Sequence, residues 1–246
     1  MNLIVDIGNT RTKFYIFNRG DLAISVPVDD FEPGYIELLQ NEYPQLDKAI
    51  VSSVKDYSPE IKQKFQESFQ TFVELDSETP LPVQNNYKTK ETLGYDRIAA
   101  VVGANCLYPG ENILVIDAGS AITYDFISDK GVYLGGNISP GMEMRYKALN
   151  KFTGKLPLVG LKKSNVLFGD TTESAIRAGV QNGIIYEVDA TIGSFKDFYN
   201  NLKVIITGGD ANFFDKKLKN SFFVNFNLTG IGLNRILEYN GETEKS

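Results

Sequence analysis

The chain has 246 residues, enough for one large or two modest domains, and its 42% hydrophobic content is typical of globular proteins. The formal net charge of −6 argues against a nucleic-acid-binding protein, because such proteins present a basic face to phosphates. Histidine is absent and Cys106 is the single cysteine, which excludes intramolecular disulfides, His-ligated zinc and Ser-His or Cys-His nucleophiles. A general base must therefore be Asp, Glu, Lys or Tyr.

The N-terminus does not have the pattern of a signal peptide, since it lacks a basic leader and Asp6 interrupts its short apolar run. No stretch approaches the roughly 20 apolar residues that a membrane-spanning helix needs. The sequence therefore predicts a soluble, cytoplasmic protein.

The first half of the chain begins with three short strands separated by polar turns. Apolar residues at 3–5 are followed by a turn at 6–10, a strand at 12–17, a second turn at 18–21 and a strand at 22–26. This order indicates an antiparallel meander. Later segments are predicted as helices at 33–42, 59–69 and 96–107 and as strands at 48–53 and 71–75.

The second half restarts the same pattern. Strands are expected at 112–116, 122–127 and 132–138, with polar turns between them. Equivalent residues lie 111 positions apart without gaps: Asp6 and Asp117, Gly8 and Gly119, Gly20 and Gly131. Internal repetition of this kind predicts a duplicated architecture. We therefore expect an N-terminal domain at 1–110 and a C-terminal domain at 111–246.

The rest of the second half is predicted to be mainly helical. Helices are expected at 142–149 and 171–198, the longer one with Asp170 as N-cap and Glu173 three residues on. A strand at 202–207 ends in the glycine-rich turn Gly208-Gly209-Asp210.

The turn at 6–13 has the chemistry of a phosphate-binding loop. Gly8 permits close approach of a ligand, and successive backbone N–H groups in such a turn form a cavity for anions. Asn9, Thr10 and Thr12 add neutral donors, and Lys13 adds a positive charge. Asp6 suits Mg²⁺, held through water. The alternative is an ordinary hairpin turn without a ligand.

The second turn repeats the carboxylate and the glycine and adds the hydroxyl of Ser120. Asp117 would coordinate a cation or position a water molecule. Its structural alternative is a strand-end carboxylate that accepts hydrogen bonds from backbone N–H groups. Two such turns, one per domain, suit a polyphosphate gripped from both sides.

Duplicated halves with these turns resemble the superfamily of acetate and sugar kinases, Hsp70 and actin. The resemblance implies an α/β fold of two related ribonuclease-H-like domains, with the nucleotide in the cleft between them. The superfamily often has a third, glycine-rich turn near the adenosine, and residues 207–211 resemble it. A generic strand-to-helix loop is the alternative for that turn.

The closer resemblance is to the type III pantothenate kinase family. Its motifs occur in order: DIGNTRTK at Asp6, GYDR at Gly94, DAGSAITYD at Asp117 followed by GGNISPGMEMR, and DTTESAIRAG at Asp170. The resemblance covers nearly the whole chain. One departure is Ser120, where the family usually has threonine, and the hydroxyl is retained.

This resemblance implies an ATP-dependent phosphorylation of pantothenate, the first step of coenzyme A synthesis. Asp96 would be the general base, Asp117 would bind potassium or ammonium, and Thr172 would reach pantothenate across a homodimer interface. The other pantothenate contacts would be Tyr87, Gly94, Tyr95, Asp96 and Arg97. The ATP contacts would be Asp6, Ile7, Gly8, Asn9, Thr10, Arg11, Thr12, Lys13 and Ser120.

The residues alone leave alternatives. Asp96 could be merely a carboxylate stabilised by the dipole at a helix start. Arg97 could hold the substrate carboxylate or pair with Asp96. The rival functions are a sugar or acid kinase of the same superfamily and a non-catalytic nucleotide-binding regulator, which would be expected to have lost the phosphate loop or the base.

Overall fold

The computed structural model describes residues 1–9, 11–29 and 31–243, and Thr10 of the predicted phosphate loop lies outside these ranges. Packing divides the chain into two compact units. The first unit comprises Met1–Gly110, Ile127–Gly135 and the segment from Asn227 onward, and the second comprises Glu111–Phe126 and Gly136–Phe226. The division into domains at 1–110 and 111–246 stays a prediction, while the packing groups the last helix with the first unit.

The first unit contains a five-stranded sheet in the order β3-β2-β1-β4-β5. Its strands are β1 (Asn2–Ile7), β2 (Thr12–Asn18), β3 (Asp21–Val28), β4 (Lys48–Ser53) and β5 (Thr71–Glu74). β1 pairs antiparallel with β2 and parallel with β4, and β4 pairs parallel with β5. The carboxyl ends of β1, β4 and β5 therefore lie at one edge of the sheet.

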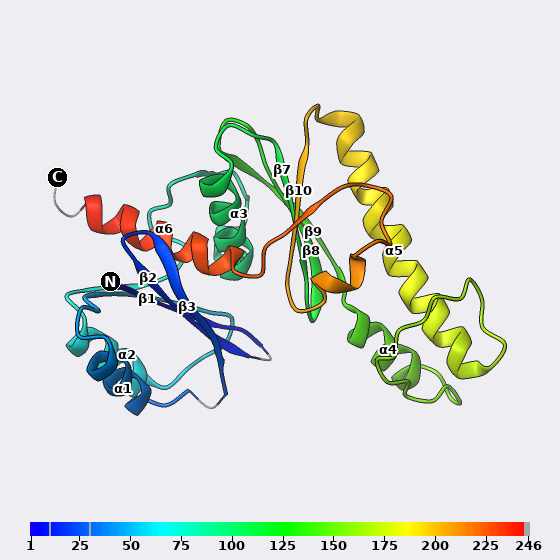
Figure 1. Ribbon diagram of the computed structural model, residues 1–246, viewed down its shortest axis with the longest axis horizontal. Helices are drawn as coiled ribbons and strands as arrows, with labels where there is room; N and C mark the ends of the chain where they lie inside the picture. Colours follow the sequence, from blue (N-terminus) through cyan, green and yellow to red (C-terminus); the bar gives the residue numbers. More distant parts are fainter. Residues whose placement is uncertain (10, 30, 244–246) are drawn as a thin grey trace. The chain divides into compact units, whose positions relative to one another are not determined.

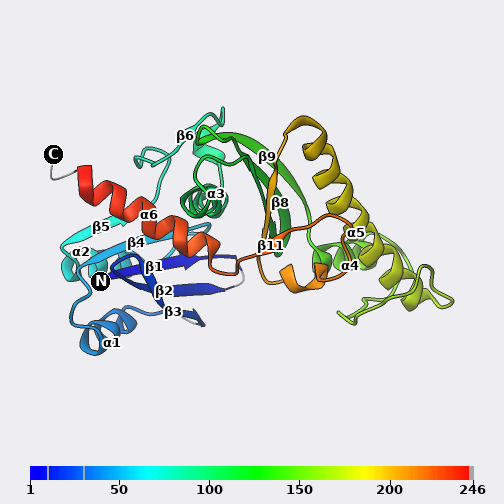
Figure 2. The same ribbon diagram turned by 45° about the horizontal axis from the view of Figure 1, so that its top comes forward.

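Helices cover both faces of this sheet (Figures 1 and 2). On one face, Ile36 of α1 (Gly34–Glu42) and Phe65 of α2 (Pro59–Ser68) pack in one apolar cluster with Val5 and Val51. On the other face, α3 (Tyr95–Leu107) and α6 (Leu228–Thr243) form a second cluster with Ile4, Tyr15 and Ile50. Alternation along each strand decides which side chains face which helices.

The two helices α3 and α6 approach each other closely at glycines. A Cβ atom on Gly103 would lie 2.2 Å from the carbonyl oxygen of Leu228, and one on Gly232 would lie 1.8 Å from that of Ala99. Neither position has room for a side chain. These glycines therefore fix where α6 crosses α3.

The second sheet has the order β11-β10-β7-β8-β9-β6. Its strands are β6 (Gln84–Asn85), β7 (Ile113–Ala118), β8 (Ala121–Ile127), β9 (Val132–Pro140), β10 (Lys203–Thr207) and β11 (Phe223–Val224). The run β9-β8-β7-β10-β11 repeats the order of the first sheet, and β10 again pairs parallel with β7. The predicted duplication is thus visible in the topology.

The repeat is not free of gaps, which corrects one expectation. β2 begins at Thr12, but its counterpart β8 begins at Ala121, two residues earlier than the constant offset requires. The turn after β7 is shorter and the turn after β8 is longer, so the offset is restored at Gly131. Gly20 and Gly131 both have positive φ, +87° and +69°, a conformation that glycine adopts readily.

The second unit has one core between its sheet and two helices. α4 (Met142–Lys151) and α5 (Thr172–Phe198) contribute Met142, Tyr146, Ile176 and Ile184 to it, together with Leu114 of β7. A 3₁₀ turn lies before α3, at Lys90–Thr92, and another lies after β10, at Ala211–Phe214. Within the described part of the chain, no helix is long and apolar enough to cross a membrane.

Candidate active site

The carboxyl edge of the first sheet carries a pocket of about 850 Å³. Open α/β sheets bind ligands at this edge, where the strands end. The pocket is lined by residues that follow β4 and β5 and by the start of α3. They include Ser53, Val54, Lys55, Asp56, Glu74, Leu75, Asp76, Gly94 and Tyr95. The start of α3 therefore lies at the same edge as the end of β4.

The predicted first phosphate loop joins β1 to β2 at this edge. The N–H of Val54, just after β4, donates to the carbonyl oxygen of Ile7 at 3.1 Å. The N–H of Gly8 donates to the carbonyl oxygen of Arg11 at 3.0 Å and closes the turn. A Cβ atom on Gly8 would also lie 3.0 Å from that oxygen, so a side chain there would be tightly confined.

The side chains of this loop point in different directions. Ile7 and Thr12 are buried, and strand alternation aims them at the face covered by α1 and α2. Half-buried Asp6 and Lys13, which are register partners, point to the face covered by α3 and α6. Asn9 and Arg11 are exposed. Ile7 can thus offer a ligand only its backbone, whereas Asp6 and Lys13 share the face on which α3 begins.

The GYDR segment forms the first turn of α3. Gly94 is the N-cap residue and supplies no side-chain cap. The side chain of Asp96 turns back toward it, with Oδ1 accepting the N–H of Arg97 at 2.9 Å. A Cβ atom on Gly94 would lie 2.5 Å from the same Oδ1. Glycine at 94 therefore leaves the space that the Asp96 carboxylate occupies.

Tyr87 and Arg97 come together beside this turn. Arg97 is only 6% exposed, and its guanidinium carbon lies 5.5 Å from the centre of the Tyr87 ring. The Tyr87 ring stacks on Tyr133 at 6.0 Å between ring centres. Gly135, whose φ is +117°, lies against the Tyr87 ring: a Cβ atom on it would lie 3.6 Å from Cδ2 of Tyr87. The fold thus gathers Tyr87, Gly94, Asp96 and Arg97 in the first unit.

Tyr133 and the loop at 55–57 were not singled out from the sequence. Tyr133 is fully buried and reaches Tyr87 because β6 pairs with the tip of the β8–β9 hairpin. Lys55, Asp56 and Tyr57 line both the large pocket and a smaller one of about 390 Å³ beside Arg11 and Thr12. Their position directly after a strand of a parallel pair is the sequence feature that could have indicated a ligand site there.

In the second unit, the turn after β7 is shaped by close backbone contacts. The N–H of Gly119 donates to the carbonyl oxygen of Ala121 at 2.9 Å. Gly208, at the end of the neighbouring β10, has φ of +91°, and a Cβ on it would lie 2.4 Å from Asp117 Oδ1. The glycine-rich turn predicted from the sequence therefore packs directly on the half-buried Asp117.

The start of α4 adjoins the same turn. The N–H of Gly141, the N-cap of α4, donates to the carbonyl oxygen of exposed Ser120 at 3.1 Å. A Cβ on Gly141 would lie 2.2 Å from the carbonyl oxygen of Gly119. The positive end of a helix dipole is therefore placed beside Ser120, and helix N-termini attract phosphate.

Negative charge collects near this turn as well. Burial, followed by the charge of Glu143 in the first turn of α4, raises the pKa of Asp210 above its usual value. A bound cation would offset the repulsion between these carboxylates. In residues 1–9, 11–29 and 31–243, no group of three or more Asp, Glu, Cys or His side chains is arranged to hold a metal. A cation at Asp117 would therefore need further oxygen ligands from backbone or phosphate.

A polar network fixes the segment that leads into α4. Arg145 donates to Glu187 at 2.6 Å and, through Nε, to the carbonyl oxygen of Pro140 at 2.8 Å. Tyr124 donates to the other oxygen of Glu187 at 2.8 Å. Burial works to raise the pKa of Glu187, but the hydrogen bonds from Arg145, Ser139 and Tyr124 lower it below the usual value. The network attaches the GGNISPG segment to α5.

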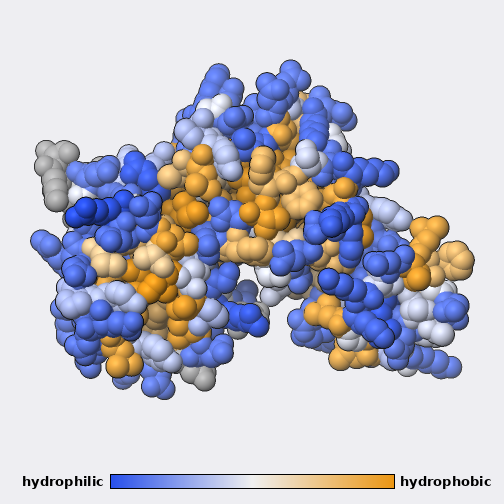
Figure 3. Space-filling view, viewed as in Figure 1, coloured by the Kyte–Doolittle hydropathy of each residue, from blue (hydrophilic) through white to orange (hydrophobic). Residues whose placement is uncertain are grey.

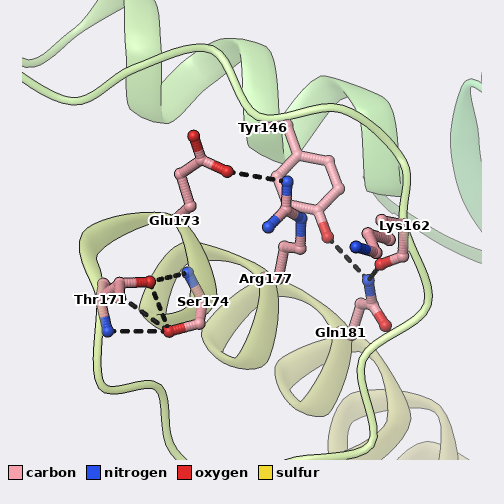
Figure 4. A network of polar contacts seen from close by, with 7 residues as sticks. All are labelled: Tyr146, Lys162, Thr171, Glu173, Ser174, Arg177 and Gln181. Atoms are coloured by element: carbon pink, nitrogen blue, oxygen red, sulfur yellow. Dashed lines mark hydrogen bonds and ion pairs between the residues drawn. The ribbon is translucent and has the colours of Figure 1, made fainter.

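Thr172 is the first residue of α5 and is exposed. The predicted cap was wrong by one residue: Thr171, not Asp170, is the N-cap, and it forms a capping box with Ser174 (Figure 4). Ser174 N donates to Thr171 Oγ1 at 3.2 Å, and Thr171 N donates to Ser174 Oγ at 2.9 Å. Farther along α5, buried Gln181 donates to Tyr146 at 3.0 Å (Figure 4). These contacts hold the helix start that presents Thr172.

Comparison with known proteins gives the family. The model of the type III pantothenate kinase family matches residues 2–194. The chain belongs to this family. A type III pantothenate kinase of Phocaeicola vulgatus is 48% identical over 98% of this chain and 99% of its own length. One from Christiangramia forsetii is 45% identical over 98% and 99%.

Solved structures agree with the predicted fold. A Campylobacter jejuni protein described as a Baf family transcriptional activator superposes with a TM-score of 0.58 at 26% identity, covering 98% of this chain and 99% of its own. A glucokinase from an Antarctic psychrotroph gives 0.56 at 13% identity, covering 97% and 98%. The latter likeness shows the fold alone. The prediction of two related ribonuclease-H-like domains is confirmed.

Gly208 offers a test of how tightly the second turn is packed. We expect Gly208→Ala to lower the free energy of unfolding by about 1–3 kcal/mol, because the new methyl group would meet Asp117 and the backbone of Ala118. Gly209→Ala is the matched control, since nothing lies within 4 Å of its Cβ position. Urea denaturation followed by circular dichroism measures both. Equal stability of the two variants would contradict the described packing.

Proposed function

We propose that this chain transfers the γ-phosphoryl group of ATP to the primary hydroxyl of pantothenate, giving 4′-phosphopantothenate in the first step of coenzyme A synthesis. Family membership supports the reaction class and the substrate. The observation that carries the site is that α3 begins, with Asp96 in its first turn, at the same sheet edge as the turn after Asp6. This proximity supports Asp96 as the base and the turn after Asp6 as a phosphate loop.

The two turns would bind the phosphates of ATP. In the first, exposed Asn9 and Arg11 offer hydrogen-bond donors, and Lys13 offers positive charge. In the second, Ser120 and the start of α4 offer a hydroxyl and a helix dipole. A magnesium ion bound with ATP would neutralise phosphate charge, and Asp6 suits it because Mg²⁺ prefers oxygen ligands and retains water. Positioning and charge neutralisation are what phosphoryl transfer mainly requires.

Asp96 would accept the proton of the pantothenate hydroxyl. As that oxygen forms its bond to the γ-phosphorus, the bond to the bridging oxygen breaks and ADP leaves. Asp96 lies in the first turn of α3, where the helix dipole favours the ionised carboxylate needed for a base. The Arg97 N–H that donates to Oδ1 stabilises the same anion.

Pantothenate carries a carboxylate, and the cluster beside Asp96 has the complementary group. Arg97 presents a guanidinium over the ring of Tyr87, and the Arg97 side chain also lies beside Gly94. We propose that this cluster binds the acceptor, with Arg97 facing its carboxylate. Guanidinium is well suited to that partner because its planar donors match a carboxylate.

A monovalent cation is proposed at Asp117. The support is the accumulation of carboxylates there, where burial and the charge of Glu143 already raise the pKa of Asp210. Potassium or ammonium would offset this charge beside the phosphates.

We further propose a homodimer in which Thr172 of one subunit completes the acceptor site of the other. The segment before α5 exposes apolar side chains, namely Phe152, Leu158, Leu161, Val166, Leu167 and Phe168. An apolar pocket of about 480 Å³ lies between α4 and α5 in the same unit. Orange, hydrophobic atoms interrupt the polar surface over this part of the chain (Figure 3). Large apolar side chains exposed in one segment are typical of protein interfaces.

Two other functions are weaker. The Campylobacter jejuni relative is described as a transcriptional activator, but it is 26% identical, and the net charge of −6 here disfavours contact with DNA. A sugar kinase shares the fold, but the glucokinase is 13% identical and the curated relatives that match over nearly full length are pantothenate kinases.

An acceptor panel tests the proposal directly. ADP release is measured with pantothenate, glucose, N-acetylglucosamine and acetate, each in potassium and in sodium buffer. We expect turnover with pantothenate alone, and faster in potassium. Turnover with a sugar and none with pantothenate would refute the substrate. Equal rates in the two buffers would refute the cation site and leave the reaction intact.

Asp96→Asn tests the base. We expect kcat to fall by about a hundredfold or more, because an amide cannot accept the proton, while ATP binding stays near that of the unmodified protein. Binding is measured by isothermal calorimetry and kcat by the same assay. Glu91→Gln, in the 3₁₀ turn before α3, controls for loss of a nearby carboxylate. Retained turnover would remove Asp96 as the base.

Mixed dimers test the shared site. Asp96→Asn and Thr172→Ala chains with different tags are co-expressed and the heterodimer is purified. If each site combines Asp96 of one subunit with Thr172 of the other, half of the sites in the heterodimer are intact, and activity returns to about half that of the unmodified dimer. Activity no higher than the mean of the two parent variants would show that the site lies within one chain.

A further inference from the structure

Ser52, on β4, has a buried hydroxyl group that no contact in the described part of the chain explains. The residue is 0% exposed, and its Oγ has no hydrogen-bond partner among the residues that the structure describes. The buried neighbours along the strand are apolar: Ala49, Ile50 and Val51. Buried polar atoms are nearly always satisfied, so an exception calls for an explanation.

Strand alternation shows where this hydroxyl points. Ile50 packs in the cluster with α3 and α6, whereas Ala49 and Val51 pack in the cluster with α1 and α2. Ser52 therefore faces the same side as Ile50, toward the helices α3 and α6. The neighbouring Ser53 faces the opposite side, and its Oγ donates to the carbonyl oxygen of Lys55 at 2.5 Å.

On that face, Ser52 stands in a row with two residues of the phosphate loop. Asp6 is the register partner of Ser52 in the parallel pair β1–β4, and Lys13 is the register partner of Asp6 in the antiparallel pair β1–β2. Alternation places all three side chains on the face covered by α3 and α6. Adjacent strands are about 4.8 Å apart, so one rotation about χ1 brings a serine hydroxyl within reach of a carboxylate on the next strand.

We propose that Ser52 is a positioning residue, whose Oγ donates a hydrogen bond to the Asp6 carboxylate when ATP and magnesium are bound. An ionised carboxylate accepts several hydrogen bonds, so this one adds to the other contacts of Asp6. It would fix one carboxylate oxygen and leave the second directed at the metal-bound water. The inference rests on the proposed role of Asp6 in the ATP site.

Three variants test it: Ser52→Ala, Ser52→Cys of similar size but with a weak donor, and Ser25→Ala as a control on the same sheet. Ser25 lies on β3, and its hydroxyl donates to Asn227 at 2.9 Å. The measurements are kcat, the KM values for pantothenate and magnesium, and Tm with and without magnesium and ATP. Asp6→Asn is measured alongside to report on the site itself.

We expect Ser52→Ala and Ser52→Cys to keep or raise the Tm of the ligand-free protein, since each removes an unsatisfied polar group. We expect kcat to fall about tenfold, or about 1.4 kcal/mol of transition-state stabilisation. KM for magnesium should rise, KM for pantothenate should stay unchanged, and the increase in Tm on adding magnesium and ATP should shrink. Ser25→Ala should leave kcat and both KM values unchanged.

The opposite outcomes overturn the inference. A lower Tm in both Ser52 variants would show that the hydroxyl stabilises the folded protein. An unchanged kcat and an unchanged KM for magnesium would show that the hydroxyl has no role in the ATP site. If Asp6→Asn loses activity while the Ser52 variants keep it, Ser52 is excluded as a positioning residue and the proposed ATP site stands. If Asp6→Asn retains full activity, the proposed ATP site fails first, and the Ser52 inference falls with it.

Discussion

The site depends on a central strand that pairs antiparallel on one side and parallel on the other. In the first sheet, β1 lies between antiparallel β2 and parallel β4, so the turn after Asp6 opens at the edge where β4 and β5 also end. The antiparallel pairing of β1 with β2 holds the turn, and the chain that follows β4 leaves the sheet beside that turn. That arrangement gives α3 space to begin at this edge and to bring Asp96 there. In the second unit, β7 occupies the same place beside β10.

Glycines decide how closely other segments approach the two turns. Gly94 leaves room for the Asp96 carboxylate, Gly208 lies against Asp117, and Gly141 brings the start of α4 onto the carbonyl oxygens at 119 and 120. In each case a Cβ atom would come within 2.6 Å of an oxygen atom. Close backbone packing therefore places the start of α4 beside the second turn, and a helix start supplies fixed positive charge that attracts phosphate.

The hydrogen bonding of buried polar groups differs between the two units. The Glu187 network is closed: Arg145 and Tyr124 occupy its two oxygens and pull its pKa down in spite of burial. Ser52 differs, since its hydroxyl lies in an apolar strand beside Asp6 without a partner in the described chain. A closed network stabilises one arrangement, whereas the unsatisfied hydroxyl beside Asp6 supports the proposal that a further hydrogen bond forms when the ligand binds.

The two Asp-Gly turns, the duplication and the family could be predicted without the structure, because each depends on residue types at fixed local spacing. Strand alternation and turn chemistry are local, so β1, β2 and β3 and their repeats were predictable to within about two residues. Tertiary structure decided the rest. The meeting of Tyr87 with Arg97 depends on β6 joining the β8–β9 hairpin, and the direction of Ser52 depends on which helices cover which face. Thr171 is the N-cap of α5 because its hydroxyl accepts from the backbone N–H of Ser174, and the Ser174 hydroxyl accepts from that of Thr171. The sequence offers several neighbouring oxygen atoms as caps, and the backbone geometry decides between them.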